Sequence, residues 1–255
     1  MITVKSAREL DLMARAGRIV GATLALVAER TRPGMSTLDL DVLAEEFIRS
    51  HDGAIPSFKG LYGFPATLCT SLNDEVVHGI PSRRRVLGEG DILSVDVGAC
   101  VSGFHADSAV TLPVGRVSPE AEGLLRTTQE ALAAGIAAVR AGAHVGDVGH
   151  AVQQVAEAAG YSVVRELVGH GIGSSFHEEP QVPNYGSPRK GPRLVAGMTI
   201  AVEPMINSGR REVRTLPDKW TVVTVDGSLS AHFEHTVVVA ENDARILTGR
   251  PVPQG

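Results

Sequence analysis

The hydrophobic pattern of the chain predicts four helices, because apolar residues recur every three or four positions in four stretches. Ser6 and Glu9 have the spacing of a capping box at the start of the first helix, and Ser36 starts the second helix in a similar way. Pro119 marks the start of the third helix, since proline is favoured at the first helical position. The apolar positions that define the first, second and fourth helices are Leu10, Met13, Val20, Leu24 and Val27; Leu40, Leu43 and Phe47; and Val148, Val152 and Val155.

Three short runs rich in β-branched residues predict strands, and each of them adjoins a carboxylate. The runs 92–95, 199–202 and 236–239 lie next to Asp96, Glu203 and Glu234, respectively. An ionised carboxylate in a buried strand costs several kcal/mol unless a positive group compensates it. The pattern therefore indicates a functional site rather than ordinary packing.

Four sequence motifs occur twice, in the same order, and this predicts a single catalytic domain over residues 1–255 built from two homologous halves. The paired stretches are RPGMSTLDLDVLAEEF with RAGAHVGDVGHAVQQV, VVHGIP with VGHGIG, GDILSVD with GMTIAVE, and HADSAVT with HFEHTVV. We expect the halves to cover residues from about 6 to 115 and from about 118 to 247. The repeat pairs His78 with His170, Asp96 with Glu203, and Asp107 with Glu234.

Asp96 and Asp107 flank a hairpin-turn signal, VSG at residues 101–103. A turn centred on residues 101 and 102 would place the two aspartates directly opposite each other, and a turn centred one residue later would make them diagonal neighbours on one face. In either register their Cβ atoms lie within about 4.5–8 Å. Two carboxylates at that separation require protonation or a cation.

The complete set of polar residues in these motifs predicts a dinuclear metal site. Four carboxylates and one imidazole (Asp96, Asp107, Glu203, Glu234 and His170) suit two divalent ions of the Mn, Fe, Co or Zn kind. Two such ions about 3.5–4 Å apart convert a shared water into a hydroxide nucleophile. The alternative, that each carboxylate forms a salt bridge, is weaker for the set because no lysine or arginine lies in these motifs.

Composition and charge narrow the class of protein. The 255 residues are 43% hydrophobic and 21% charged, with a net charge of −5, as in ordinary soluble globular proteins, and this gives no reason to expect DNA as a partner. We interpret the short basic clusters 83–85 and 210–214 as solvated loops. The N-terminus lacks a signal peptide, and no apolar window is long enough for a membrane span, so we expect a cytoplasmic protein. Cys69 and Cys100 do not form a disulfide framework and are expected to be small hydrophobic residues.

Five motifs together resemble the bacterial form of the type I methionine aminopeptidases: NDEVVHGIP, DVGACVSGFHADSA, VGHGIGSSFHEEP, TIAVEPM and SAHFEHTVVV. The resemblance runs from about Ser6 to Leu247. It implies the α+β "pita-bread" fold shared with Xaa-Pro aminopeptidases, in which two pseudo-symmetric halves form an antiparallel sheet covered by helices, with the site on the concave face. It also implies an enzyme that removes the initiator methionine from nascent polypeptides with small second residues, by attack of a metal-bound hydroxide.

The same resemblance implies individual roles for the polar residues. Asp96 would be a bidentate ligand of one metal ion, Asp107 and Glu234 would bridge both ions, and His170 and Glu203 would complete the other. Glu203 would also shuttle a proton. His177 would hydrogen-bond the scissile amide and stabilise the oxyanion, although a solvent-exposed loop histidine is the alternative, and His78 would contact the amide nitrogen on the leaving side.

The resemblance further implies an apolar pocket for the methionine side chain, formed by Phe58, Leu61, Phe64, Cys69, Phe176 and Trp220. Phe58, Leu61 and Phe64 depart from the cysteine, tyrosine and tyrosine that the family often carries there, which affects selectivity, and for Phe58 an ordinary core position is the alternative. The ions would be Co, Mn, Fe, Zn or Ni, and a monovalent cation is expected near Asn73.

Two other functions compete with this interpretation. Xaa-Pro aminopeptidases carry an extra N-terminal domain, for which a first helix starting at about Ser6 leaves no room. A non-catalytic relative that binds protein partners or RNA would have lost several of the ligands retained here. Absence of the type II insertion and of the eukaryotic N-terminal extension favours the short bacterial form. We expect a monomer that acts on nascent N-termini, with the ribosome as a partner, and a mobile tail from Arg250.

Overall fold

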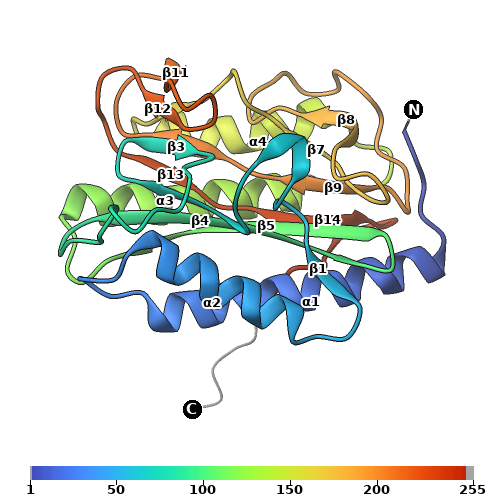
Figure 1. Cartoon of the computed structure of the whole chain (residues 1–255). Coiled ribbons are helices and arrows are strands. Elements are labelled where there is room, and N and C mark those ends of the chain that lie inside the picture. Colours follow the sequence, from blue (N-terminus) through green and yellow to red (C-terminus); the bar gives the residue numbers. More distant parts are fainter. Residues whose placement is uncertain (1, 251–255) are drawn as a thin grey trace, which may run out of the picture.

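The computed structural model, described here for residues 2–250, combines four α-helices with short antiparallel sheets (Figure 1). The helices are α1 (Ala7–Arg30), α2 (Thr37–Arg49), α3 (Pro119–Ala137) and α4 (Val145–Ala158), with one 3₁₀ turn, η1 (Leu61–Gly63). The strands of the first part of the chain are β1 (Ala54–Pro56), β2 (Leu68–Leu72), β3 (Glu75–Val77), β4 (Ile92–Val101) and β5 (Phe104–Pro113). Those of the second part are β6 (Ser162–Val163), β7 (Gly169–Gly171), β8 (Glu178–Val182), β9 (Thr199–Val202), β10 (Met205–Asn207), β11 (Val213–Thr215), β12 (Val222–Thr224), β13 (Ser230–His232), β14 (His235–Val239) and β15 (Ala244–Ile246). The tail beyond residue 250, which we expected to be mobile, lies outside the described residues.

The predicted helix starts are confirmed by the cap hydrogen bonds. Ser6 N donates to Glu9 Oε2 over 2.7 Å while Glu9 N donates to Ser6 Oγ over 3.4 Å, which completes the predicted capping box before α1. Ser36 caps α2 in the same reciprocal manner, and Ser118 Oγ accepts from the first turn of α3. Local sequence therefore determines where these helices begin.

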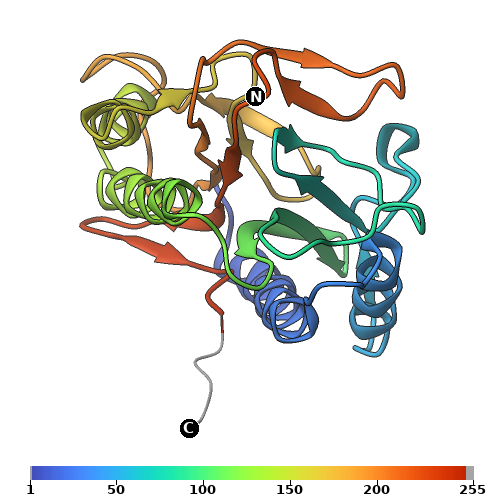
Figure 2. The same cartoon turned by 90° about the vertical axis from the view of Figure 1, so that its left-hand side faces the viewer.

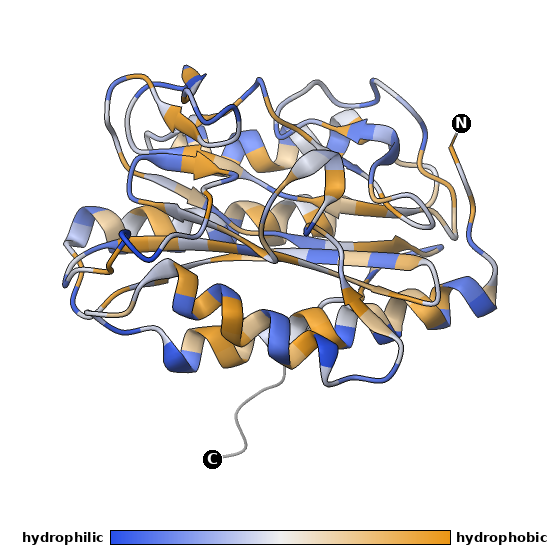
Figure 3. Cartoon of the chain, in the orientation of Figure 1, coloured by the Kyte–Doolittle hydropathy of each residue, from blue (hydrophilic) through white to orange (hydrophobic). Residues whose placement is uncertain are grey.

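The first sheet has the order β1-β4-β2, with β5 also paired to β4, and α1 packs against both β4 and β5. Seen end on, α1 and α2 lie together on one side of the molecule and α3 and α4 on another (Figure 2). Orange and blue residues alternate along α1 and α2, as expected for helices with one buried face (Figure 3).

The second large sheet has the order β15-β14-β9-β7-β8, and α3 packs against β9 and the nearby strands β10 and β13. The two sheets meet where β14 contacts β5. At this junction Glu234 N donates to Ala109 O over 3.0 Å, and Asp107 N donates to Thr236 Oγ1 over 3.1 Å. Residues more than a hundred positions apart are thus fixed side by side, in the middle of a core that includes residues from both parts of the chain.

The strands confirm the predicted β-runs, with β4 extending through Asp96 to Val101. The internal repeat itself stays a prediction.

Among residues 2–250, no helix combines the length and the apolar run that a membrane crossing requires. Both cysteines are free and buried.

One interpretation of the basic clusters was wrong. Arg83 and Arg84 are exposed, but the side chain of Arg85 is only 24% exposed and forms an ion pair with Glu75. The sequence alone could not distinguish Arg85 from its two exposed neighbours, because the carboxylate that pairs with it, Glu75, lies in a different segment.

Candidate metal and substrate site

The β4–β5 hairpin determines how the two aspartates face the cavity. Its turn residues are Ser102 (φ 50°) and Gly103 (φ 83°), so both have positive φ as a type I′ turn requires. Asp96 is therefore paired with Ala109 and Asp107 with Gly98. Of the two registers left open by the sequence, the second is present: the aspartates are diagonal neighbours on the same face of the hairpin.

The second sheet brings three more polar residues to that face. Glu234 directly precedes β14 at the junction of the sheets, Glu203 directly follows β9, and His170 is the middle residue of β7. The ligand atoms of Asp107, His170 and Glu234 all lie within 4.8 Å of one another. His170 Nε2 lies 3.5 Å from Asp107 Oδ2 and 3.6 Å from Glu203 Oε1, so Glu203 adjoins this group.

Neighbouring groups hold two of these side chains in orientations suited to metal binding. His170 Nδ1 donates to Gly171 O over 2.8 Å, which leaves Nε2 as the nitrogen that faces the carboxylates. Thr236 Oγ1 donates to Asp107 Oδ1 over 2.8 Å, so that Oδ2 is the oxygen turned toward His170. Both orientations result from contacts across the sheet rather than from local sequence.

The electrostatics of the cluster favour the binding of a cation. Burial, followed by the charges of Asp107 and Glu203, raises the pKa of Asp96 well above its ordinary value, and burial with the same neighbours also raises the pKa of Glu234. Burial likewise raises the pKa of Glu203. Although burial alone would lower it, the hydrogen bond and charge of Asp107 raise the pKa of His170 to about 9. Each shift opposes the crowding of negative charge, as expected for carboxylates built around a cation.

The donor set fits divalent metal ions. Asp96 Oδ1 is buried and has no hydrogen-bond partner among the described residues, which is costly for a carboxylate oxygen unless a cation contacts it. Carboxylate oxygens with one imidazole nitrogen form the ligand type that suits Mn, Fe, Co or Zn. In the described part of the chain, no lysine or arginine is among the main causes of the pKa shifts of Asp96, Glu203 and Glu234.

Every residue that the sequence analysis assigned to the site lines one cavity of about 220 Å³. At its polar end lie Asp96, Asp107, His170, Glu203 and Glu234; at its apolar end and rim lie Phe58, Leu61, Phe64, Cys69, Phe176, Trp220, His78 and His177. The structure thus brings together residues that span positions 58–234 of the sequence.

Packed aromatic rings form the apolar end of the cavity. Phe58 and Phe176 meet edge to face with centroids 5.3 Å apart, and Phe64 meets Trp220 in the same way at 5.1 Å. A Cβ atom on Gly98 would lie only 2.9 Å from Phe58, so glycine is required where the hairpin passes beneath this ring. Cys69 is paired with Asp96 across β2 and β4, and burial raises the pKa of its thiol, which opposes a role as a nucleophile.

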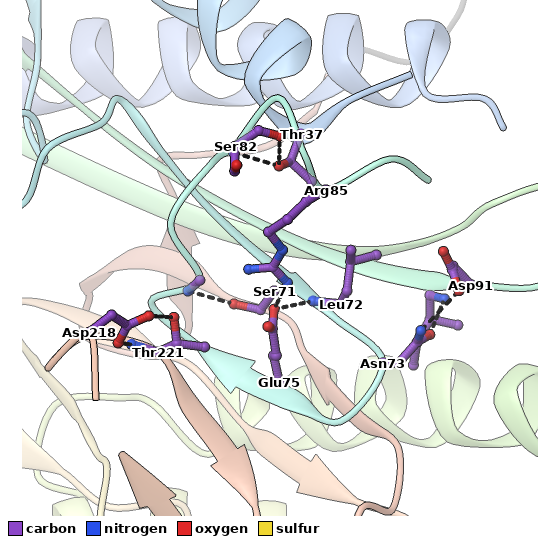
Figure 4. A network of polar contacts seen from close by, with 12 residues as sticks. Thr37, Ser71, Leu72, Asn73, Glu75, Ser82, Arg85, Asp91, Asp218 and Thr221 are labelled. Carbon is purple, nitrogen blue, oxygen red and sulfur yellow. Dashed lines mark hydrogen bonds and ion pairs between the residues drawn. The ribbon is translucent and has the colours of Figure 1, made fainter. Parts of the chain in front are cut away.

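His78 lies on a tightly anchored loop beyond β3. It has a φ of 60°, and Gly79 next to it donates to Ser71 Oγ over 3.1 Å. At the other end of the loop the Glu75 carboxylate accepts from Leu72 N over 2.8 Å and pairs with Arg85 (Figure 4).

The same network reaches the loop that carries Trp220. Asp218 accepts from the backbone N–H groups of Trp220 and Thr221, each over 2.9 Å, and from the Thr221 hydroxyl over 2.6 Å (Figure 4). Burial would raise the pKa of Asp218, but the hydrogen bonds from Thr221 and Trp220 lower it, and the positive charge of Arg85 adds a smaller lowering. Arg85 therefore lies between two loops that line the cavity.

His177 is exposed at the rim, beside His170. Its ring is stacked on Tyr62, with a centroid separation of 5.7 Å and an interplanar angle of 10°, and its Nδ1 lies 3.3 Å from the Tyr62 hydroxyl. The centroids of the His170 and His177 rings are 4.5 Å apart. Burial, followed by the charge of His170, lowers the pKa of His177 to about 4, which favours the neutral imidazole that can donate a hydrogen bond.

Sequence reasoning missed several residues that line the cavity: Tyr62, Val77, Leu167, Val168, Met205 and His232. The buried His232 is the most polar omission, since its Nε2 lies 3.8 Å from Glu203 Oε2. The repeated motifs HADSAVT and HFEHTVV align His232 with His105, so the sequence did contain a pattern that could have identified His232. No sequence pattern pointed to Tyr62, because it follows Leu61 in a segment without hydrophobic periodicity.

Asn73, near which a monovalent cation was expected, lies outside the lining of this cavity. Its side chain donates to Asp91 over 2.9 Å and accepts from Ile92 N over 3.0 Å, and its carbonyl accepts from Ser230 N over 2.9 Å. These contacts connect the loop after β2 to β4 and to the start of β13 (Figure 4).

Comparison with known proteins supports this geometry. The sequence profile of metallopeptidase family M24 matches residues 11–241. The chain is 53% identical over 248 residues to the methionine aminopeptidase of Clostridium perfringens, with 97% of this chain and 99% of that protein covered.

Solved structures agree with this similarity. The crystal structure of methionine aminopeptidase from Thermotoga maritima superimposes with a TM-score of 0.96 at 44% identity, covering 98% of this chain and all of that chain. An X-Pro aminopeptidase of the same organism shares the fold with a TM-score of 0.77 at 21% identity, and the match covers 97% of this chain but 63% of that one.

Proposed function

Because the chain belongs to metallopeptidase family M24, we propose that it is a methionine aminopeptidase, which removes the N-terminal methionine of polypeptides with small second residues. The observation that carries this proposal is the cavity, which has a carboxylate-rich end and an apolar end in direct contact. An apolar pocket beside a carboxylate cluster suits an exopeptidase that binds one terminal side chain.

Two divalent metal ions would be held by Asp96, Asp107, His170, Glu203 and Glu234. Bound there, they would activate a water molecule and polarise the carbonyl of the first peptide bond. Burial and mutual repulsion raise the pKa values of Asp96 and Glu234, and Asp96 Oδ1 lacks a hydrogen-bond partner among the described residues, which supports this assignment. The metal used in the cell is set by availability among Co, Mn, Fe, Zn and Ni.

The chain's own polar residues would carry out the proton and charge chemistry. The free α-amine of the substrate would bind at Asp96, next to the apolar end of the cavity. Glu203, whose pKa burial raises, would accept a proton from the attacking water and pass it to the leaving amine. His177 would donate to the scissile carbonyl oxygen as negative charge develops, and His78 would contact the leaving nitrogen.

The methionine side chain would lie against Phe58, Leu61, Phe64, Cys69, Phe176 and Trp220, all of which line the cavity. Edge-to-face rings present a polarizable surface, which suits a thioether. Phe58 is largely buried yet lines the cavity, so a role in the pocket and a role in packing coexist at this position.

We also propose that the natural substrates are nascent polypeptide N-termini. This assigns the protein to the cytoplasm, as a monomer that acts at the ribosome. A monovalent cation near Asn73 would stabilise the junction of β4 and β13, which Asn73 connects through its hydrogen bonds with Ile92 and Ser230.

The test strips metal from the protein with a chelator, restores Mn, Co or Fe, and compares Met-Ala-Ser with Ala-Pro-Ser as substrates. We expect release of methionine only with metal, and loss of that release in an Asp96→Ala variant. Cleavage of the proline peptide alone would assign the chain to the Xaa-Pro class instead. No turnover with any of the metals would overturn the enzymatic proposal and favour a binding protein.

A further inference from the structure

The loop that carries His177 is fastened at one end by an ion pair with the N-terminal segment. The loop connects β7 to β8 and presents Phe176 and His177 to the cavity. Glu178, the next residue, accepts from the Lys5 ammonium group over 2.5 Å. The two side chains are only 5% and 9% exposed, so this is a buried ion pair rather than a surface contact.

Glu178 has no free acceptor oxygen in this arrangement. One oxygen accepts from both Lys5 and the Thr3 hydroxyl, and the other accepts from Ser175 N, over 3.2 Å, inside the same loop. Lys5 in turn donates to Thr3. Burial would raise the pKa of Glu178, but hydrogen bonds from Lys5, Thr3 and Ser175 lower it, so the carboxylate is ionised and holds the loop.

Lys5 is attached to rigid parts of the fold. Its backbone N–H donates to Gly197 O over 2.9 Å, and α1 begins two residues later with its capping box. Its stem lies so close to the loop that a Cβ atom on Gly173 would be 2.4 Å from Lys5 Cε. The N-terminal segment runs down the side of the molecule on which β8 lies before α1 starts (Figure 1).

The rest of the loop has few other anchors near His177. Gly173 O accepts from His105 N over 2.9 Å, and Phe176 packs against Phe58 and the ring of His105, but these contacts precede His177 in the chain. The ring of His177 is exposed and contacts the rings of Tyr62, His170 and Phe176. Directly after the histidine, Glu178 begins β8 and is paired with Gly171 of β7 beside an irregularity in the ladder, and its ion pair with Lys5 adds a buried side-chain anchor at this end of the loop.

We infer that Lys5 and Glu178 are positioning residues for the reaction, which hold His177 at the scissile bond through the buried ion pair. This inference rests on the proposed function, because it concerns the same cavity. It makes the extended segment before α1 part of the catalytic apparatus, although that segment does not line the cavity that holds the predicted ligands.

The central experiment is a double-mutant cycle between Lys5→Met and His177→Ala. Lys5→Met keeps most of the apolar stem and removes the charge, so we expect kcat on Met-Ala-Ser to fall about tenfold through misplacement of His177. In the His177→Ala background the same substitution should change kcat by less than about twofold, because the group it positions is gone. Lys5→Arg, which retains the positive charge, should recover most of the activity.

Glu179→Gln is the matched control for Glu178→Gln. The two glutamates are adjacent, but Glu179 is exposed and makes no ion pair among residues 2–250. Glu178→Gln should lower kcat as Lys5→Met does, while Glu179→Gln should leave it unchanged. Metal content should be the same in all of these variants, because neither glutamate belongs to the ligand cluster.

Hydrogen exchange of the amides of residues 173–178 separates this inference from the proposed function. Lys5→Met should accelerate exchange in this loop and leave β4 and β5 unchanged, whether or not the protein releases methionine. If Lys5→Met lowers kcat by the same factor with and without His177, or leaves both kcat and loop exchange unchanged, the inference is wrong. Should Lys5→Met fail to fold, Thr3→Val, which removes only the hydroxyl that bridges the pair, gives the same comparison.

Discussion

The two ends of the cavity are built in different ways. The carboxylate end lies on long paired strands, where β4 and β5 are joined along ten residue pairs and β14 is joined to β9 along four. The histidine rim lies on loops, which are held by a few side-chain contacts: Glu75 with Arg85 beside His78, and Glu178 with Lys5 beside His177. Backbone ladders fix the position of a side chain cooperatively, whereas a single ion pair can be lost in one substitution.

This difference suits the two tasks that we propose. Carboxylates that repel one another must be held in place, and paired strands fix their backbone positions while single contacts such as that of Thr236 with Asp107 orient the side chains. The groups that contact a peptide must admit it and release the product, and loops anchored at their ends can give way. The comparison predicts which substitutions affect the metal site, which affect substrate chemistry alone, and how large each effect is.

The largest effect is expected from Asp107→Asn, because this side chain belongs to the tightest group of ligand atoms. Loss of its charge should lower kcat/KM by more than about a thousandfold and reduce the bound metal. Metal content by elemental analysis, together with methionine release, checks this prediction. Asp52→Asn, at an exposed position, should behave as the unchanged protein does; retention of full activity by the Asp107 variant would contradict the site.

His177→Ala should lower kcat by roughly a hundredfold to a thousandfold, the range for loss of one oxyanion donor, while metal content stays the same. A steady-state assay on Met-Ala-Ser with a parallel metal analysis distinguishes the two ends of the cavity. If the His177→Ala variant also loses metal, the histidine rim and the carboxylate end do not function independently, and the distinction between the two ends of the cavity is wrong. His150→Ala, on α4 and outside the cavity, serves as the control.

Thr236→Val should weaken metal binding about ten- to a hundredfold, because the hydroxyl that orients Asp107 is lost while the ligand itself remains. Titration of the stripped protein with Mn or Co, followed by activity, measures this shift. Excess metal should restore most of kcat. A variant whose activity stays low at saturating metal would assign Thr236 a role beyond orienting the carboxylate.

The smallest effect concerns Arg85→Met. Loss of its charged hydrogen bonds should reduce the free energy of unfolding by about 2 kcal/mol, and loosening of the His78 and Trp220 loops should lower kcat/KM about tenfold. Urea unfolding and kinetics measure the two effects. Arg49→Ala, which removes an exposed pair with Glu45, should cost less than about 0.5 kcal/mol; equal costs for both arginines would show that burial of Arg85 is unimportant.

Much of the fold could be predicted from local chemistry. The caps at Ser6, Ser36 and Ser118 fixed the helix starts, since a cap depends only on residues within one turn. The candidate site residues were also accessible, because each carboxylate interrupts a β-branched run and the same motifs resemble a known family. Their identities therefore followed from pattern, and the structure places all of them on one cavity.

What the sequence left open depends on contacts between distant residues. The hairpin register between Asp96 and Asp107 depended on which of two turns forms, and positive φ at both Ser102 and Gly103 decided it. The sequence predicted that Arg85 is a solvated surface residue, whereas the fold pairs it with Glu75. No sequence pattern predicted the position of Tyr62 beside His177.

The sequence by itself thus determined the four helices, the strand runs that adjoin the carboxylates and the types of polar residue available for the site, because these depend on neighbours along the chain. Only the tertiary structure decided which atoms face the cavity and what holds them there. Glu178 is the clearest case: in the sequence it is one of two adjacent glutamates, and in the fold it alone is buried against Lys5, 173 residues away. A pair separated by that distance is created by folding, so no local pattern can reveal it.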